Sequence, residues 1–161
     1  MFHVCSTGHR RRGRPFVDGY GTKAFLKKEI AASGALIDMG VYHIVQMLYL
    51  LDMPKVERVS EKGYREMGRR TTGAGSGVRC GGFGFVKFAD GVTMDICEAW
   101  SVHLGSFEGC SIIGNRGGIR MTGYSDQAAL TPFSYHTTVC DLDLNCTVNL
   151  NEMDIRWQQL R

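Results

Sequence analysis

The sequence lacks the segments and spacings that are typical of secreted proteins, of membrane-spanning proteins and of proteins with structural zinc sites. It has 6 cysteines, but no two of them form a C-x-x-C pair, so a structural zinc site has little support. Met1–Arg14 holds no apolar stretch of a signal peptide, and no run of about 18 apolar residues occurs in the chain. We therefore expect a reduced, cytoplasmic protein that has no membrane partner.

The chain also has little excess of charge of either sign. The net charge is +3, and the basic cluster His9–Arg14 is accompanied by neither a second basic patch nor interleaved aromatic residues. These features do not favour a nucleic-acid partner. With 161 residues, of which 43% are hydrophobic and 22% charged, the chain fits one globular domain that spans residues 1–161.

Proline is rare, with 3 residues, whereas glycine is common, with 21, and this balance favours tight turns and hairpins. Alternating or β-branched segments predict strands at Met1–Thr7, Lys55–Tyr64, Gly82–Phe88, Val92–Ser101, Ser111–Gly114, Gly118–Thr122 and Asp141–Asn151. Asp141–Asn151 alternates without a break, which is typical of a half-buried strand with one wet face. The fold class that follows is α+β, an open, largely antiparallel β-sheet of about six strands with helices on one face.

Two helices are expected before the second strand. Thr22 can cap a short helix over Lys23–Ala32, which Ser33-Gly34 would end. Gly34–Leu51 then has the apolar density of a mostly buried helix, and Pro54 prevents this helix from continuing.

Asp38, Tyr42 and Tyr49 fall at positions i, i+4 and i+11 of the second helix, so their polar groups would lie nearly on one line. A carboxylate and a phenol one turn apart can handle a proton together. An Asp favoured by the helix dipole and a Tyr packed in the core explain the same spacing, and spacing alone favours that structural interpretation. His43 lies about 100° further round the helix and is either a hydrogen-bonding group or a buried histidine.

Other segments carry weaker hypotheses. Asp141–Glu152 places oxygen donors at the spacing of a calcium loop, but Cys146 occupies the position that requires glycine, so a strand explains the alternation better. Cys97, Cys110 and Cys146 have apolar neighbours and are predicted to be small buried hydrophobes. Tyr64–Cys80 is polar and rich in glycine, which indicates a mobile loop.

The segment S-G-A-L-I-D-M-G-V-Y-H-I, at Ser33–Ile44, resembles the G-G-G-x-L-x-D-x-G-x-H/Y signature of the glucose–fructose oxidoreductase/inositol dehydrogenase (Gfo/Idh/MocA) family. Arg10–Pro15, R-R-R-G-R-P, is similar to the segment that precedes this signature in many members. Further on, F-V-K-F-A-D-G-V-T-M-D and I-I-G-N-R-G-G-I-R-M resemble two hairpins of the family. The four segments occur in the family's order and cover Arg10–Met121 well.

The resemblance implies a C-terminal, substrate-binding domain with the dihydrodipicolinate-reductase-like fold, from an NAD(P)-dependent oxidoreductase that acts on a sugar or polyol hydroxyl. Tyr42 matches the family's proposed general acid/base, with Asp38 beside it, and His43 is the second choice for that role. Arg12 and Tyr20 are the expected substrate-binding residues, and an arginine fork suits anionic or hydroxyl-rich groups. No metal site is expected.

The dinucleotide-binding (Rossmann) half of such enzymes has no counterpart in the sequence. No G-x-G-x-x-G follows an apolar strand and opens a helix, because in Gly73–Gly84 the third glycine is replaced by Val78 or Cys80. The family's E-K-P lysine, a cation that would help a phenol to lose its proton, is absent as well. We therefore expect an isolated domain that binds no NAD or NADP alone, whereas the full-length enzyme would use one of them.

The resemblance and the width of the sheet also predict assembly. One layer of two helices cannot cover both faces of the sheet, whose strands carry bulky side chains such as Phe83, Phe85 and Trp100. Packing of the uncovered face on itself would give a homo-dimer or tetramer, as is common in the family. The alternative to an enzyme is a non-catalytic assembly or interaction module from a split or degenerate oxidoreductase.

Overall fold

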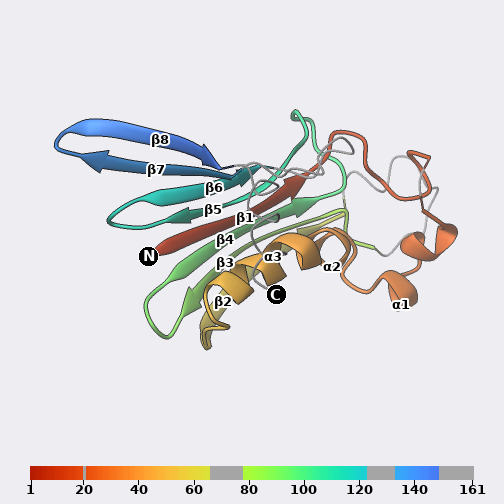
Figure 1. Ribbon diagram of the computed structural model, residues 1–161. Helices are drawn as coiled ribbons and strands as arrows, with labels where there is room; N and C mark the ends of the chain where they lie inside the picture. Colours follow the sequence, from red (N-terminus) through yellow and green to blue (C-terminus); the bar gives the residue numbers. More distant parts are fainter. Residues whose placement is uncertain (20, 66–77, 123–132, 149–161) are drawn as a thin grey trace, which may run out of the picture.

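The computed structural model describes residues 1–19, 21–65, 78–122 and 133–148. In this part of the chain, strands form one open sheet in the order β2-β3-β4-β1-β5-β6-β7-β8 (Figure 1). Their bounds are β1 His3–His9, β2 Val56–Tyr64, β3 Gly81–Phe88, β4 Thr93–Ala99, β5 Phe107–Ile113, β6 Gly118–Thr122, β7 Phe133–Val139 and β8 Leu142–Val148. Neighbours are antiparallel except β1 and β4, which run parallel. The predicted open, largely antiparallel sheet is confirmed, and it also contains β7, a strand that the sequence analysis did not predict.

Four short helical segments precede β2, namely the 3₁₀-helix η1 (Lys23–Leu26), α1 (Lys28–Ala31), α2 (Ala35–Asp38) and α3 (Gly40–Leu50). Thr22 caps η1 as predicted, since its hydroxyl oxygen accepts a backbone N–H of the first turn at 3.3 Å. The single helix expected over Gly34–Leu51 is wrong, because it breaks at Met39, and the helical stretches Lys28–Asp38 and Gly40–Leu50 on either side meet at 53°. Among the described residues, no helix alone has the length and apolar content to cross a membrane, and only Lys28–Asp38 and Gly40–Leu50, taken together, have them.

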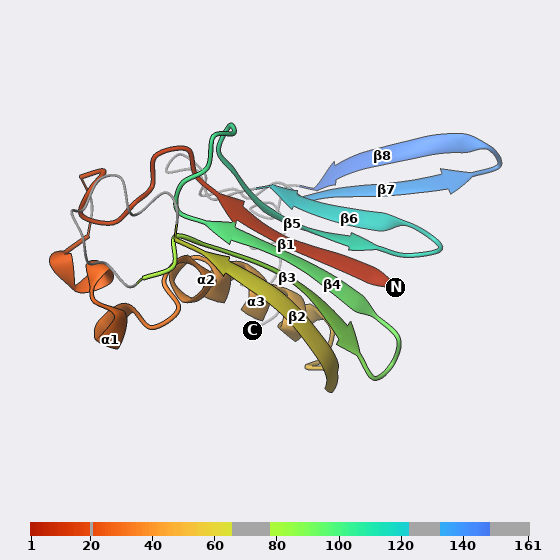
Figure 2. The ribbon, with the colours of Figure 1, turned by 180° about the vertical axis from the view of Figure 1, so that it is seen from behind.

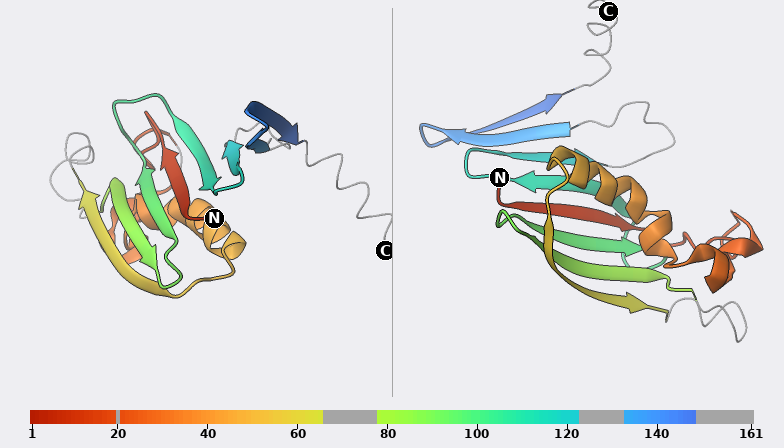
Figure 3. Two further views of the ribbon diagram at one scale, coloured as in Figure 1. Left: turned by 90° about the vertical axis from the view of Figure 1, so that its left-hand side faces the viewer. Right: turned by 90° about the horizontal axis from the view of Figure 1, so that it is seen from below.

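The helices α2 and α3 lie on one face of the sheet, and the other face, called the open face below, has no helix over it in the described part of the chain (Figures 2 and 3). Along β1, Val4, Ser6 and Gly8 are buried toward the helices, while the residues between them face the other way. The main core lies between α3 and the central strands, where Met47 packs with Val4 and Phe88. Alternation along the strands therefore decides which side chains can meet the helices.

Trp100, which follows β4 directly, is the centre of a second cluster of buried side chains. It is fully buried with Ala35 and Met39 beneath α2, and its ring meets that of Phe25 edge-on at 6.4 Å between centroids. Trp100, one of the bulky strand side chains named in the sequence analysis, therefore faces the helices and not the uncovered face. Even-numbered residues of β4 face the helices, and Trp100 continues their alternation beyond Ala99.

The hairpin of β7 and β8 extends the sheet beyond the helices (Figure 1). Residues 142–147 form the predicted strand, but all of their side chains are exposed, so the expectation of a half-buried strand is wrong. Leu142 is 66% exposed and Cys146 is exposed too, because α3 packs on β1 and β5 and does not reach this edge. Of the cysteines expected to be buried, Cys110 is buried and Cys97 is partly buried.

Candidate functional site

The candidate site begins at Gly34, where the chain enters α2. Gly34 has φ of +66°, and a Cβ at this position would overlap the carbonyl oxygen of Arg79. The same carbonyl accepts a hydrogen bond from the backbone N–H of Ala35 at 3.2 Å. A glycine is therefore required here so that α2 can dock closely on the backbone that leads into β3. This docking places Asp38, the last residue of α2, over the end of β4.

The carboxylate of Asp38 is held by the indole of Trp100. Nε1 of Trp100 donates a hydrogen bond of 2.7 Å to Oδ2 of Asp38. The indole cannot turn away, because it is buried in the cluster described above. Asp38 itself is only partly buried. The result is a carboxylate of fixed orientation at the edge of the protein surface.

Tyr42 lies in the first turn of α3 with its side chain 65% exposed. Its neighbours on the outside of the two helices are also exposed, and they include the apolar Ile37, Val41 and Val45 as well as Tyr49 further along α3. We call this outer side of α2 and α3 the helix surface. It carries an accessible phenol with apolar side chains around it, and the fixed carboxylate of Asp38 precedes this phenol by four residues. A carboxylate and a phenol are groups that can take part in proton transfer.

His43, the second residue proposed for proton transfer, is placed in the core instead of on the helix surface. Its Nδ1 lies 3.2 Å from both carboxylate oxygens of Glu98, a residue with no exposed surface. The hydroxyl of Ser6 donates to Oε1 of the same carboxylate at 3.0 Å. Gly8 lies against this group, and a Cβ there would overlap Glu98 and come within 2.7 Å of the imidazole.

The sequence analysis missed Glu98, Ser6 and Trp100. A signal for Glu98 exists, since it alternates with Met94 and Ile96 and therefore occupies a core-facing position of β4. A charged residue at such a position requires partners, which His43 and Ser6 provide.

The basic cluster His9–Arg14 contains two arginines in ion pairs and two exposed arginines, Arg11 and Arg12. Arg10 pairs with Glu108, and Arg14 pairs with Asp18 at 2.7 Å. The hydrogen bond between Arg14 and Asp18 raises the pKa of the guanidinium and lowers the pKa of the carboxyl. Arg12, one of the predicted substrate-binding residues, is exposed. Tyr20, the other, lies outside the described residues.

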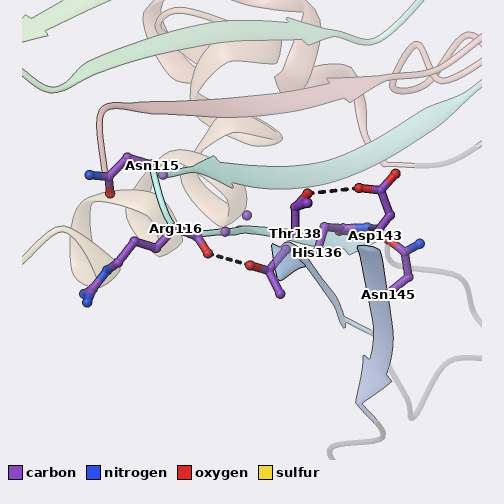
Figure 4. A pocket seen from close by; sticks show the side chains of 10 residues that line it. Asn115, Arg116, His136, Thr138, Asp143 and Asn145 are labelled. Atoms are coloured by element: carbon purple, nitrogen blue, oxygen red, sulfur yellow. Dashed lines mark hydrogen bonds between the residues drawn. The ribbon is translucent and has the colours of Figure 1, made fainter. Parts of the chain in front are cut away.

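A polar hollow lies between the tips of the β5–β6 and β7–β8 hairpins, away from Asp38 (Figure 4). Its polar groups largely satisfy one another, because Thr137 donates to the carbonyl of Arg116 at 2.7 Å and Thr138 donates to Asp143 at 2.9 Å. Since the described residues of the proposed calcium loop form β8 and pair with β7, the strand interpretation of this segment is confirmed.

The described residues form no Rossmann cradle for a dinucleotide. A Rossmann cradle needs a strand that runs through a glycine-rich turn straight into a helix, and in the described part of the chain no strand does so. Part of Gly73–Gly84, like most of the predicted loop Tyr64–Cys80, lies outside the described residues.

The fold has known counterparts. Levoglucosan dehydrogenase, in complex with NADH and levoglucosan, matches with a TM-score of 0.72 at 18% identity over 92% of this chain and 39% of its own. An inositol dehydrogenase homologue from Azotobacter vinelandii, in complex with NAD⁺, matches with a TM-score of 0.72 at 11% identity over 92% of this chain and 36% of its own. GenD2 from gentamicin A biosynthesis, in complex with NAD, matches with a TM-score of 0.60 at 20% identity over 80% of this chain and 36% of its own.

The chain thus spans about two fifths of the length of these solved proteins, and the likeness to them shows the fold. No curated protein sequence matches the chain. The family described as GFO/IDH/MocA C-terminal domain matches residues 2–120, which is most of the sequence. The match includes the helix surface with Asp38 and Tyr42 as well as the strand that carries Glu98. The chain therefore belongs to the GFO/IDH/MocA C-terminal domain family.

Proposed function

We propose that this chain is the substrate-binding domain of an NAD(P)-dependent oxidoreductase that acts on a hydroxyl group of a sugar or polyol. The observation that supports the proposal is that an oriented carboxylate is followed, four residues later, by an accessible phenol. Asp38 is fixed by Trp100, and Tyr42 follows it across the break between α2 and α3. An alcohol bound at this surface would exchange its hydroxyl proton with Tyr42, while Asp38 orients the reacting groups.

A nicotinamide would supply or accept the hydride, and it would be held by a domain that the described residues do not form. The helix surface suits contact with such a domain, because Ile37, Val41 and Val45 expose apolar side chains around Tyr42. Closure of a second domain here would exclude water from the substrate and shield the proton transfer. Arg12, which is exposed on the loop after β1, would add hydrogen bonds to substrate oxygens.

The test uses a two-domain protein in which a dinucleotide-binding domain precedes this chain. Tyr42→Phe is expected to lower kcat with sugar or polyol substrates by about 10²- to 10⁴-fold, the usual contribution of a general acid/base. The fold should survive, because the Tyr42 side chain is 65% exposed. Tyr49→Phe, which removes another exposed phenol from α3, is the matched control and should leave kcat within a few-fold of the unchanged protein.

An unchanged kcat in Tyr42→Phe would contradict the role of Tyr42. If, instead, the unchanged two-domain protein turns over no sugar or polyol, the non-catalytic assembly module becomes the better interpretation. Calorimetry on the chain alone completes the test, since we expect no binding of NAD(H) or NADP(H), and micromolar affinity would place the cofactor site within this chain.

A further inference from the structure

The open face of the sheet carries a group of potential metal ligands remote from the helix surface. His3 and Cys5 alternate along β1, and Asp95 lies directly opposite Cys5 on the parallel strand β4. Within the described residues, this is the one group of three His, Cys, Asp or Glu side chains whose ligand atoms all lie within 4.8 Å of one another. We propose that His3, Cys5 and Asp95 bind a Zn²⁺ ion on the open face.

The distances between the ligand atoms fit a tetrahedral ion. Nε2 of His3 lies 3.4 Å from Sγ of Cys5 and 3.5 Å from Oδ2 of Asp95. Bonds of about 2.0–2.1 Å to nitrogen and about 2.3 Å to sulfur put two ligand atoms of tetrahedral zinc roughly 3.3–3.6 Å apart. Two of the three separations therefore match tetrahedral zinc, and the third, between the ligand atoms of Cys5 and Asp95, is within 4.8 Å.

A hydrogen-bond chain prepares the imidazole for binding. Oγ1 of Thr93 donates to the carbonyl oxygen of Phe2 at 3.4 Å and lies 2.8 Å from Nδ1 of His3. With an ion on Nε2, Nδ1–H of His3 would donate to Oγ1 of Thr93, whose own proton can go to the carbonyl of Phe2. The lone pair of Nε2 would then face the ion between Cys5 and Asp95. Such a partner behind the ring is usual for histidines that bind metals.

The donor set selects the ion. A thiolate and an imidazole favour zinc over magnesium or calcium, which prefer oxygen ligands. One thiolate and one carboxylate also neutralise the charge of Zn²⁺, which matters because His3 and Cys5 are partly buried. Three protein ligands leave a fourth position for water, on the side where the Asp95 side chain is 59% exposed. The ion would link β1 to β4, the parallel pair of the sheet.

The experiment titrates Zn²⁺ into the reduced, metal-free chain in competition with a chromophoric chelator. We expect one ion per chain, and Co²⁺ in its place should give the thiolate charge-transfer band of a Cys-ligated tetrahedral ion. Cys5→Ser and His3→Gln should weaken binding by at least about 100-fold, and Thr93→Val by about 10- to 100-fold, the usual cost of a lost partner behind a ligand. The matched controls Cys140→Ser and His9→Gln should bind as the unchanged chain does.

If the chain does not take up one Zn²⁺ ion, the proposal is overturned. The contact between His3 and Asp95 is then explained by a proton on Nε2 that is donated to the carboxylate. Equal binding by Cys5→Ser and the unchanged chain would overturn it as well. A measurement without variants guards against misfolding: Zn²⁺ should slow alkylation of Cys5 but leave the exposed Cys140 unaffected. Equal alkylation of Cys5 with and without Zn²⁺ would contradict the site.

Discussion

Nε1 of Trp100 donates a hydrogen bond of 2.7 Å to Oδ2 of Asp38, and this bond ties the helix surface to the second buried cluster. Asp38→Asn keeps an oxygen that can accept this bond, so we expect the free energy of unfolding to fall by less than about 1 kcal/mol. Asp38→Ala leaves the buried indole N–H without its acceptor and should cost about 1–3 kcal/mol. Urea denaturation of both variants measures the difference.

Equal stability of the two variants would contradict the bond between Trp100 and Asp38. If the bond holds, Asp38→Asn becomes the clean probe of the carboxylate charge. In the two-domain protein it should lower turnover while the fold is retained, because only the charge is lost.

The contrast between Asp38 and its partner shows what the sequence can predict. Asp38 and Tyr42 are proposed from local spacing and from the family signature, both of which lie within Ser33–Ile44. Trp100 is 62 residues from Asp38, and Glu98 is 55 residues from His43, so no local pattern connects them. Periodicity likewise detects the apolar content of Gly34–Leu51 but does not register the change of helix axis at Met39.

The strands show the same limit of sequence-based prediction, which finds the element but not its burial. Alternation predicts β8 correctly as a strand, because a period of two is a local property. Its burial depends on whether a helix reaches that edge of the sheet, and α3 stops at β5. Leu142 and Leu144 are therefore exposed in spite of an alternation that is typical of a buried face.

The close packing of Gly8 against the buried pair of His43 and Glu98 gives a second prediction. A Cβ at residue 8 would overlap Oε2 of Glu98 and lie 2.7 Å from Cε1 of His43. Movement of Glu98 would break its hydrogen bond from Ser6, and movement of His43 would break its contact with Glu98. Gly8→Ala should therefore lower the free energy of unfolding by about 1–3 kcal/mol or more.

The control for this substitution is Gly105→Ala, since a Cβ at residue 105 would meet nothing within 4 Å. It should change the free energy of unfolding by no more than about 0.5 kcal/mol. If urea denaturation gave both variants the same free energy of unfolding, the buried pair of His43 and Glu98 would be able to accommodate a methyl group at residue 8.

The pairing of Asp18 with Arg14 makes part of the stability depend on pH. The hydrogen bond from Arg14 lowers the pKa of the Asp18 carboxyl below its ordinary value of 3.8. The folded protein therefore gives up the Asp18 proton more readily than the unfolded chain does, and the pair stabilises the fold fully above pH 3.8. This stabilisation is lost as the pH falls below 3.8 through the lowered pKa.

Asp18→Asn removes the carboxylate, so its free energy of unfolding should differ most from that of the unchanged chain at neutral pH. The difference should shrink as the pH is lowered through 3.8 and below. Urea denaturation at a series of pH values measures it, with Glu29→Gln as a control that removes an exposed carboxylate of α1. A difference that does not vary with pH would show that Asp18 contributes through packing alone.

Self-association through the open face is the last prediction. Phe83 is 38% exposed on this face and stacks edge-on with Tyr64 at 5.5 Å between centroids, and Phe85 beside it is exposed as well. A sheet face with such aromatic groups is covered economically by a second copy across a two-fold axis. We expect the chain to form at least a dimer at a protein concentration of roughly tens of micromolar. The concentration is stated because self-association depends on it.

Light scattering in the presence of a chelator tests this assembly without a contribution from bound metal. Phe83→Glu places a charge in the proposed interface and should convert the assembly to monomers. Val45→Glu places the same charge on the helix surface, at a residue that is 47% exposed, and should leave the assembly intact. Far-ultraviolet circular dichroism checks that both variants fold. A monomeric unchanged chain would contradict the self-association. Dissociation caused by Val45→Glu but not by Phe83→Glu would show that the interface lies on the helix surface and not on the open face.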